Sequence, residues 1–187
     1  MKKYNANIEA ILIADNPDTF VSRRIPRTHI TLGGIEGDRH FGITSLADSR
    51  QPMYPRGTTI FNRRQLTITS VEECMEMADC LGVDYIDPEW LGANVMVSGF
   101  PNLTNLPIGS RMILPSGAGL LCMGENKPCT LPGEQIQVHF DQPNLTAKFV
   151  KAGFKRRGIV CLVEVPGLMA VGDEINILEN EYDNPMQ

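Results

Sequence analysis

The stretch that decides the fold class is LPIGSRMILPSGAGLLCM, residues 106–123. Two mainly apolar runs, residues 111–114 and 119–123, are separated only by Pro115-Ser116-Gly117-Ala118. Short apolar runs bounded by Pro, Gly and Ser are typical of strands joined by tight turns. Strands so closely spaced favour a barrel or a sandwich over a sheet in which strands and helices alternate. We therefore expect a mainly β domain with peripheral helices.

Further strands are expected on both sides of this stretch, at residues 7–14, 64–69, 94–97, 159–165 and 174–178. One helix begins clearly, because Ser70-Val71-Glu72-Glu73 is a capping box in which each side chain bonds the other residue's amide. That helix should end near Leu81, with Gly82 as its C-terminal cap. Residues 87–92 predict a single short helix. A basic helix is expected within residues 146–157, with Lys148, Lys151 and Lys155 on one face.

Two segments carry no clear periodicity and are predicted to be loops, at residues 44–58 and 133–145. The chain of 187 residues suits one domain, with its core at about residues 8–178 and a disordered acidic tail at residues 179–187. A net charge of −5 argues against a general nucleic-acid binder. No apolar run is long enough to span a bilayer or to form a signal-peptide core, so we expect a cytoplasmic protein without a membrane partner.

The cysteines do not form a structural set. Five are present, which is an odd number, and none belongs to a C-x-x-C pair. This pattern argues against a disulfide framework and against a structural zinc site. The three histidines lie far apart in the sequence, so their spacing predicts no metal cluster.

The most informative cysteine is Cys129, which follows Lys127 and Pro128 directly after an expected strand. Proline holds the preceding residue extended, so this cysteine should sit at a strand end rather than inside a helix. A neighbouring cation favours a thiolate, which is both a nucleophile and a soft metal ligand. The alternative is a free cysteine that only packs in the core. The residues alone leave both interpretations open.

A glycine-rich segment, GGIEGDRHFG at residues 33–42, is the second candidate site. It matches neither a Walker loop nor the dinucleotide-binding fingerprint. One interpretation is a turn in which Asp38 bonds local backbone amides. The other is a cradle that presents Asp38, Arg39 and His40 to a ligand. Asn94, at the start of an expected strand, similarly either satisfies backbone groups or offers its amide to a ligand.

Six motifs in a fixed order resemble the MOSC domain, the domain found in molybdenum-cofactor sulfurases, amidoxime-reducing components and small bacterial proteins. The resemblance covers about residues 8–178. The motifs are GIEGDRH at residues 34–40, RQLTITSVE at 64–72, LGANV at 91–95, KPC at 127–129, RGI at 157–159 and VGD at 171–173.

The resemblance implies a MOSC-type β-barrel and assigns roles to several residues. Cys129 matches the cysteine that binds molybdenum in the amidoxime reducers and is proposed to carry sulfur elsewhere. Asn94 matches an asparagine near the cofactor. The remaining expected cofactor-binding residues are the basic Arg64, Lys127 and Arg157, which would face the pterin phosphate, together with Asp38 and His40.

Three functions follow as expectations. The first is a reductase that binds molybdopterin through Cys129 and removes oxygen from small N-hydroxylated substrates, with an electron-donor protein. The second is a carrier in which Cys129 holds a persulfide or the cofactor and works with a separate cysteine desulfurase. The third is a binding module in which Cys129 merely packs. The family's pyridoxal-phosphate desulfurase domain has no counterpart in this sequence, so pyridoxal phosphate is not expected on this chain.

Overall fold

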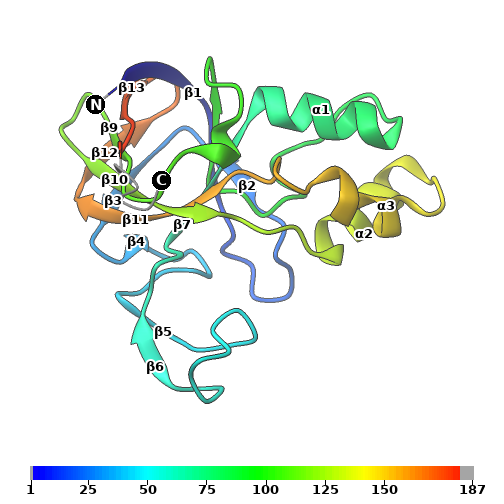
Figure 1. Ribbon diagram of the computed structural model, residues 1–187, viewed down its shortest axis with the longest axis horizontal. Coiled ribbons are helices and arrows are strands. Elements are labelled where there is room, and N and C mark those ends of the chain that lie inside the picture. The colour runs from blue at the N-terminus through cyan, green and yellow to red at the C-terminus, as the bar shows by residue number, and fades with distance from the viewer. Residues whose placement is uncertain (1, 182–187) are drawn as a thin grey trace, which may run out of the picture.

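A computed structural model describes residues 2–181, and a seven-stranded barrel is its main feature (Figure 1). One pair of neighbouring strands, residues 66–70 and 95–98, is parallel, and the other neighbouring pairs in the ring are antiparallel. The predicted mainly β architecture is therefore confirmed. Around the barrel the strands follow the order β1 (Lys3–Ile13), β13 (Glu174–Leu178), β9 (Arg111–Ile113), β10 (Gly119–Glu125), β11 (Ile159–Val165), β7 (Leu66–Ser70) and β8 (Val95–Ser98), and β8 pairs with β1.

The long strand β1 closes the barrel because it serves two neighbours. Its first half pairs with β13, and its second half pairs with β8. The register shifts between Ile8 and Ala10, and such a bulge bends a strand and increases its twist. Inside the ring, side chains such as Ile8, Ile68 and Val95 are fully buried. Burial of each such side chain contributes roughly 1.5–3 kcal/mol to stability.

Two small sheets extend from the barrel. One of them consists of β3 (Arg27–Thr31), β4 (Gly34–Ile35) and β12 (Gly167–Ala170). Strand β2 (Arg23–Ile25) is not part of it and pairs with β1. The other consists of β5 (Thr44–Leu46) and β6 (Thr59–Phe61), an antiparallel hairpin that hangs below the barrel in Figure 1. The prediction of an irregular loop at residues 44–58 was wrong for β5. This strand was missed because its three residues are too few to show a period.

The helix α1 (Val71–Leu81) confirms the predicted start and end. Ser70 Oγ accepts a hydrogen bond from the Glu73 amide at 3.2 Å, and Gly82 forms the left-handed C-terminal cap. The Glu73 side chain makes a different contact from the one that the capping box predicts. It accepts hydrogen bonds from the backbone N–H and the hydroxyl of Thr104, at 2.7 and 2.8 Å. Glu73 thereby joins α1 to the short 3₁₀ helix η1 (Leu103–Asn105).

Helices α2 (Thr130–Phe140) and α3 (Leu145–Ala152) lie beside α1 on one side of the barrel (Figure 1). The prediction of a loop at residues 133–145 was therefore wrong, except at residues 141–144, which connect the two helices. The three-lysine face is also corrected, because α3 ends at Ala152 and Lys155 lies beyond it with a φ of 60°. Residues 87–92 form hydrogen-bonded turns instead of the expected short helix.

Both ends of the described chain run along the barrel. Glu179 donates its backbone N–H to Lys2 O at 2.9 Å, and Asn180 donates to Ser110 Oγ at 3.0 Å. Most of the tail expected to be disordered, residues 182–187, lies outside the described residues. Within residues 2–181, none of the helices has the length and apolar character needed to cross a bilayer.

Candidate functional site

The site begins at Cys129, the residue that precedes α2. Its backbone is extended, with a φ of −133° and a ψ of 178°, and it occupies the N-cap position of that helix. Cys129 lies outside a helix, as expected, but it lies four residues beyond the end of β10 rather than at a strand end, and α2 starts immediately after it. The side chain is exposed, whereas Cys74, Cys122 and Cys161 are buried. The interpretation of Cys129 as a packing residue is excluded by this exposure.

A cavity of about 320 Å³ opens beside Cys129. Thr67 and Asn126 supply polar surface to its lining, whereas Phe20, Leu91 and Leu131 supply apolar surface. Basic side chains from five separate parts of the sequence converge on it. They are Arg39, Arg50, Arg64, Lys127 and Arg157, together with His40.

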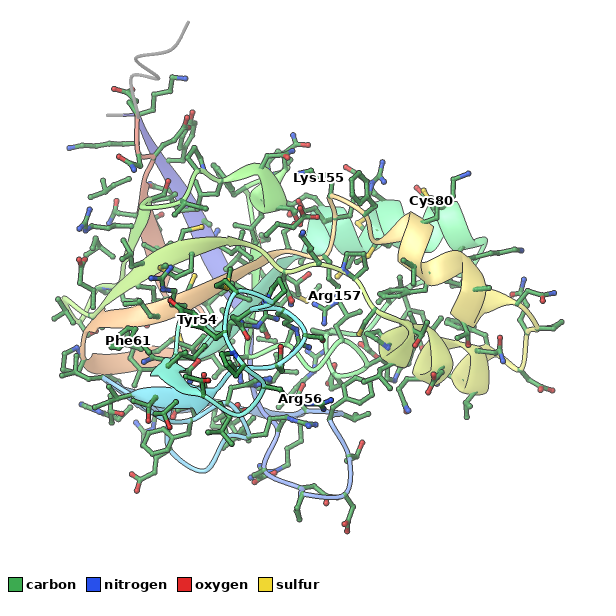
Figure 2. All side chains as sticks on the ribbon, turned by 60° about the horizontal axis from the view of Figure 1, so that its bottom comes forward. Tyr54, Arg56, Phe61, Cys80, Lys155 and Arg157 are labelled. Atoms are coloured by element: carbon green, nitrogen blue, oxygen red, sulfur yellow. The ribbon has the colours of Figure 1, made fainter. Side chains whose placement is uncertain are left out.

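Arg157 is the most deeply placed of these cations, and it lies between the barrel and the helices in Figure 2. Only 6% of its surface is exposed. Its Nη2 donates a hydrogen bond to Leu91 O, whereas its Nη1 has no hydrogen-bond partner within residues 2–181. Burial lowers the pKa of the guanidinium to about 10, so Arg157 is still a cation at neutral pH. A buried cation with an unused donor is a strong attractor for an anion.

The backbone next to Arg157 is tightly fixed. Gly158 has a φ of +78°, and a Cβ at this position would lie 1.9 Å from Ile68 O. Its N–H donates to Thr104 Oγ1 at 2.7 Å, and its carbonyl accepts from the Asn126 amide at 2.9 Å. These contacts fix the backbone next to Arg157 against β7, η1 and the segment that follows β10.

Arg64 lies at the cavity's other side and is half-buried. Its Nη2 donates to Asn126 Oδ1 at 2.9 Å, and its backbone N–H donates to Asn62 Oδ1 at 3.0 Å. Desolvation lowers the pKa of the Arg64 guanidinium, and the like charge of Arg50 adds to this effect. The guanidinium therefore carries a positive charge that the surrounding protein solvates poorly.

The cavity holds more cations than carboxylates. Arg50 pairs with Asp48 at 2.5 Å. In the described part of the chain, no carboxylate forms an ion pair with Arg39, Arg64, Lys127 or Arg157. Because the whole chain carries a net charge of −5, this local excess of positive charge is a specific feature of the cavity. An anionic ligand fits it.

Asp38 and Asn94 stand behind the cavity wall rather than in it. Asp38 Oδ2 accepts from the Ala14 N–H and from Asn94 Nδ2, both at 2.8 Å, and Oδ1 accepts from the His40 N–H at 2.8 Å. Oδ1 also lies 3.0 Å from His40 Nδ1. Asn94 Oδ1 accepts from the Thr67 N–H at 3.0 Å. The structure thus combines both interpretations of the glycine-rich segment, since Asp38 bonds local amides while His40 reaches the cavity.

The charge of Asp38 is stabilised despite its burial. Desolvation is the largest influence and raises the pKa of this carboxyl, but the combined hydrogen bonds from His40 and Ala14 outweigh it, and the net pKa is lowered. The carboxylate therefore fixes the orientation of His40, whose remaining ring nitrogen, Nε2, is the one available to a ligand.

Five of the seven predicted site residues line the cavity, and Asp38 and Asn94 support it. Sequence reasoning missed Arg50 and Phe20, which tertiary structure alone brings to the site. Among the described residues, no three His, Cys, Asp or Glu side chains are grouped as a metal site. Cys129 is therefore the one soft ligand that this cavity offers to a metal.

Comparison with known proteins agrees with this arrangement. The sequence model of the MOSC domain matches residues 36–176. The chain belongs to the MOSC domain family. A curated Bacillus subtilis (strain 168) relative, named "Putative metal-sulfur cluster biosynthesis proteins YuaD", is 54% identical over 177 residues, which cover 94% of this MOSC chain and 92% of the relative.

Several solved structures have the same fold as this MOSC domain. The crystal structure of the YuaD protein from Bacillus subtilis has a TM-score of 0.93 at 52% identity and covers 96% of this chain and 99% of its own. YiiM from Escherichia coli has a TM-score of 0.59 at 16% identity, with 98% and 73% of the two chains covered. YiiM from Geobacillus stearothermophilus has a TM-score of 0.63 at 12% identity, with coverage of 93% and 75%. At these low identities the likeness to YiiM concerns the fold alone.

Proposed function

We propose that this MOSC protein binds molybdopterin in the Cys129 cavity and reduces small N-hydroxylated substrates. The observation that carries the proposal is one exposed thiol beside a cavity in which four basic side chains form no ion pair with a carboxylate of the described residues. Molybdopterin needs both features, because it carries a phosphate and its metal accepts a soft sulfur ligand.

The residues of the cavity fit such a group. The Nη1 of Arg157 is a buried donor without a partner among the described residues, and Arg64 and Lys127 supply two further positive charges to the lining of the same cavity. Cys129 Sγ would be the protein's ligand to the metal. Because a dithiolene cofactor supplies its own sulfur atoms, a cavity with a single cysteine suffices.

When bound, the molybdenum centre supplies two-electron oxygen-atom removal. The chain's own residues bind, orient and handle protons. Arg157 and Lys127 would hold the phosphate and so fix the cofactor's position in the cavity. The Asp38 carboxylate holds His40 through Nδ1, which leaves Nε2 to donate or accept a proton at the cavity wall.

A second candidate function is a sulfur carrier, in which Cys129 holds a persulfide. The exposure of Cys129 favours it, since a donor enzyme must reach the sulfur. The name of the Bacillus subtilis relative, which refers to metal-sulfur cluster biosynthesis, also supports it. The partner would then be a cysteine desulfurase, whereas the reductase needs an electron-donor protein. Both functions need a reduced thiol, which the cytoplasm maintains.

Metal and pterin analysis tests the first proposal. The chain is expressed in a host that makes the cofactor, and wild type is compared with Cys129→Ser and with Cys80→Ser, which removes another exposed thiol. Near-stoichiometric molybdenum in the wild type and in Cys80→Ser, with loss in Cys129→Ser, is the expected result. Absence of molybdenum from all three proteins contradicts it.

Mass spectrometry after incubation with a cysteine desulfurase and cysteine tests the second. A carrier gains the mass of one sulfur atom on Cys129 and passes it to an acceptor. A chain that gains no sulfur, or gains it equally on Cys80, is not a carrier through Cys129.

A further inference from the structure

The β5–β6 hairpin contains a recess that the proposed function does not use. Its volume is about 460 Å³, within the range of small-molecule sites. Its walls come entirely from residues 45–64. Tyr54 and Phe61 both line it, and they lie near one another in Figure 2. Although these aromatic side chains line a hollow, 50% and 53% of their surfaces remain exposed.

The recess is held in shape by the hairpin's own hydrogen bonds. The Ala47 N–H donates to Thr58 O at 2.8 Å, and the Gly57 N–H donates to Ala47 O at 2.9 Å. The Tyr54 N–H donates to Gln51 O at 3.1 Å. The loop that carries Tyr54 is thus a folded structure that needs no ligand to form.

Asn62 fastens the hairpin to the Cys129 site. Its Nδ2 donates to the carbonyl oxygens of His40 and Gly42 at 2.8 and 3.0 Å, and its Oδ1 accepts from the Arg64 N–H. The hairpin therefore has a fixed position relative to His40 and the glycine-rich segment.

Arg64 connects the two hollows. It lines the hairpin recess, the Cys129 cavity and a third hollow between them. Within residues 2–181, Asn126 Oδ1 is the one hydrogen-bond acceptor for its guanidinium, and no carboxylate pairs with it. A ligand in the recess consequently meets an incompletely paired cation at the end nearest Cys129.

We propose that the hairpin recess is a subsite for an aromatic anion, with a flat ring against Tyr54 and Phe61 and an anionic group on Arg64. The proposal names the substrate class for the Cys129 site, and in that respect it rests on the proposed function. A ring that occupies the recess places the adjoining part of the ligand beyond Arg64, toward Cys129.

Three observations select this ligand class. Two aromatic faces favour a flat ring, because stacked rings gain more than their buried area alone provides. Arg64 and the neighbouring Arg63 both line the recess, so a negative charge is favoured over a neutral or positive one. None of the described residues that line the recess is an aspartate or a glutamate, so no carboxylate there favours a cation.

Binding to the purified, metal-free chain tests the proposal. The probe is naphthalene-2-carboxylate, compared with the neutral naphthalene-2-carboxamide and with cyclohexanecarboxylate, which keeps the charge but lacks the flat ring. Calorimetry gives the affinity, and amide shifts of the ¹⁵N-labelled chain locate the probe. The variants are Tyr54→Ala, Phe61→Ala and Arg64→Gln, with Phe154→Ala as the matched control because Phe154 is an exposed phenylalanine outside the recess.

Naphthalene-2-carboxylate should bind more tightly than either analogue and shift amides of residues 45–64. Each aromatic replacement should weaken it roughly tenfold, in keeping with the contribution of a stacked ring. Arg64→Gln should remove the preference for the carboxylate over the carboxamide, and Phe154→Ala should bind as wild type does. Equal binding of the three probes, shifts outside the hairpin, or equal weakening by Phe154→Ala would overturn the proposal.

The two proposals fail separately. Because the probe binds a metal-free chain, loss of probe binding speaks against the subsite and leaves molybdenum loading untouched. Absence of molybdenum from the wild type contradicts the proposed function and leaves the result of the probe titration unaffected.

Discussion

Asn94 Nδ2 donates a 2.8 Å hydrogen bond to Asp38 Oδ2, across a sequence separation of 56 residues. The bond joins the residue before strand β8 to the glycine-rich segment. Both side chains are buried, so neither can exchange its partner for water at low cost. This pair, with His40 attached to the other Asp38 oxygen, is the support on which one wall of the Cys129 cavity rests.

Asp38→Asn should destabilise the protein by about 1–3 kcal/mol at neutral pH, because a buried donor would lose its acceptor. The pKa of Asp38 is lowered in the folded state, so its carboxylate contributes stability that is present above the unfolded pKa of about 3.9 and is lost as pH falls through the folded pKa. Urea unfolding from pH 3 to pH 8 should therefore show a gap between variant and wild type that narrows only in acid. Asp84→Asn, on the surface, is the control; an equal loss there would contradict this account.

The reciprocal change, Asn94→Asp, should behave in the opposite sense. It places two carboxyl groups at hydrogen-bond distance in a buried site, where both cannot be ionised. One of the two must take up a proton on folding, so the variant should gain stability relative to wild type as the pH falls from 7 to 5. Thermal unfolding at several pH values measures this. A pH-independent deficit would show that shape, rather than charge, is what Asn94 provides.

Arg157→Gln should separate stability from binding. Without an anion, its loss should leave the free energy of unfolding unchanged or raise it by up to about 2 kcal/mol, because a buried, poorly paired charge is removed. Stabilisation of the wild type by inorganic phosphate, measured as a rise in Tm at constant ionic strength, should disappear in the variant.

Arg156→Gln provides the matched control for Arg157. Arg156 is the neighbouring residue and pairs with Glu76 at 2.7 Å on the surface. Its replacement should leave the phosphate effect intact. If Arg157→Gln instead unfolds the chain in the absence of anions, the guanidinium is a structural group and the anion site is misplaced.

The fold could be predicted where the determining contacts are local. The start of α1 was visible because Ser70 and the Glu73 amide that bonds it lie only three residues apart. The contact of the Glu73 side chain with Thr104 spans 31 residues and was not. Helix α2 was missed because only Pro132, Gly133 and Ile136 of its residues are buried, too few to form an apolar stripe. The closure of β1 on β13 pairs Lys3 with Leu178, and no local pattern records a contact of that range.

The candidate site shows the same division. Lys127 and Cys129 are separated only by Pro128, so their chemistry could be proposed from the residues. Arg157 could be proposed as a site residue because it belongs to the RGI motif at residues 157–159. Arg50 reaches the cavity from the β5–β6 hairpin, a placement that depends on Asn62 fastening that hairpin and that composition does not reveal.

Alkylation should distinguish the five cysteines. Burial raises the pKa of the Cys74 thiol to about 11, and it raises those of Cys122 and Cys161 as well, which removes the reactive thiolate. Cys80 and Cys129 are exposed, and Cys80 can be located in Figure 2. Iodoacetamide at pH 8 should give two rapid adducts on the native protein and five after denaturation, as counted by mass spectrometry. More than two rapid adducts would show that the barrel or the helical layer opens on that time scale.

Gly158→Ala should be the most damaging single change near the site. The added Cβ would meet Ile68 O at 1.9 Å, and Ile68 pairs with Ile159 in the β7–β11 ladder, so relief requires separating two barrel strands. Gly172→Ala is the control, because it has a similar positive φ of +88° but no atom within 4 Å of the added carbon. The control should lose only the left-handed strain of about 1–2 kcal/mol, whereas Gly158→Ala should lose several kcal/mol and yield little folded protein.

Urea unfolding of both variants decides between strain and collision as the reason for glycine at position 158. A collision also displaces the neighbouring Arg157, so any folded Gly158→Ala protein should lose its stabilisation by phosphate. Equal losses of stability in the two variants would mean that the backbone conformation alone demands glycine. The β7–β11 strand pairing and the position of Arg157 would then not both depend on the close approach of Gly158 to Ile68 O.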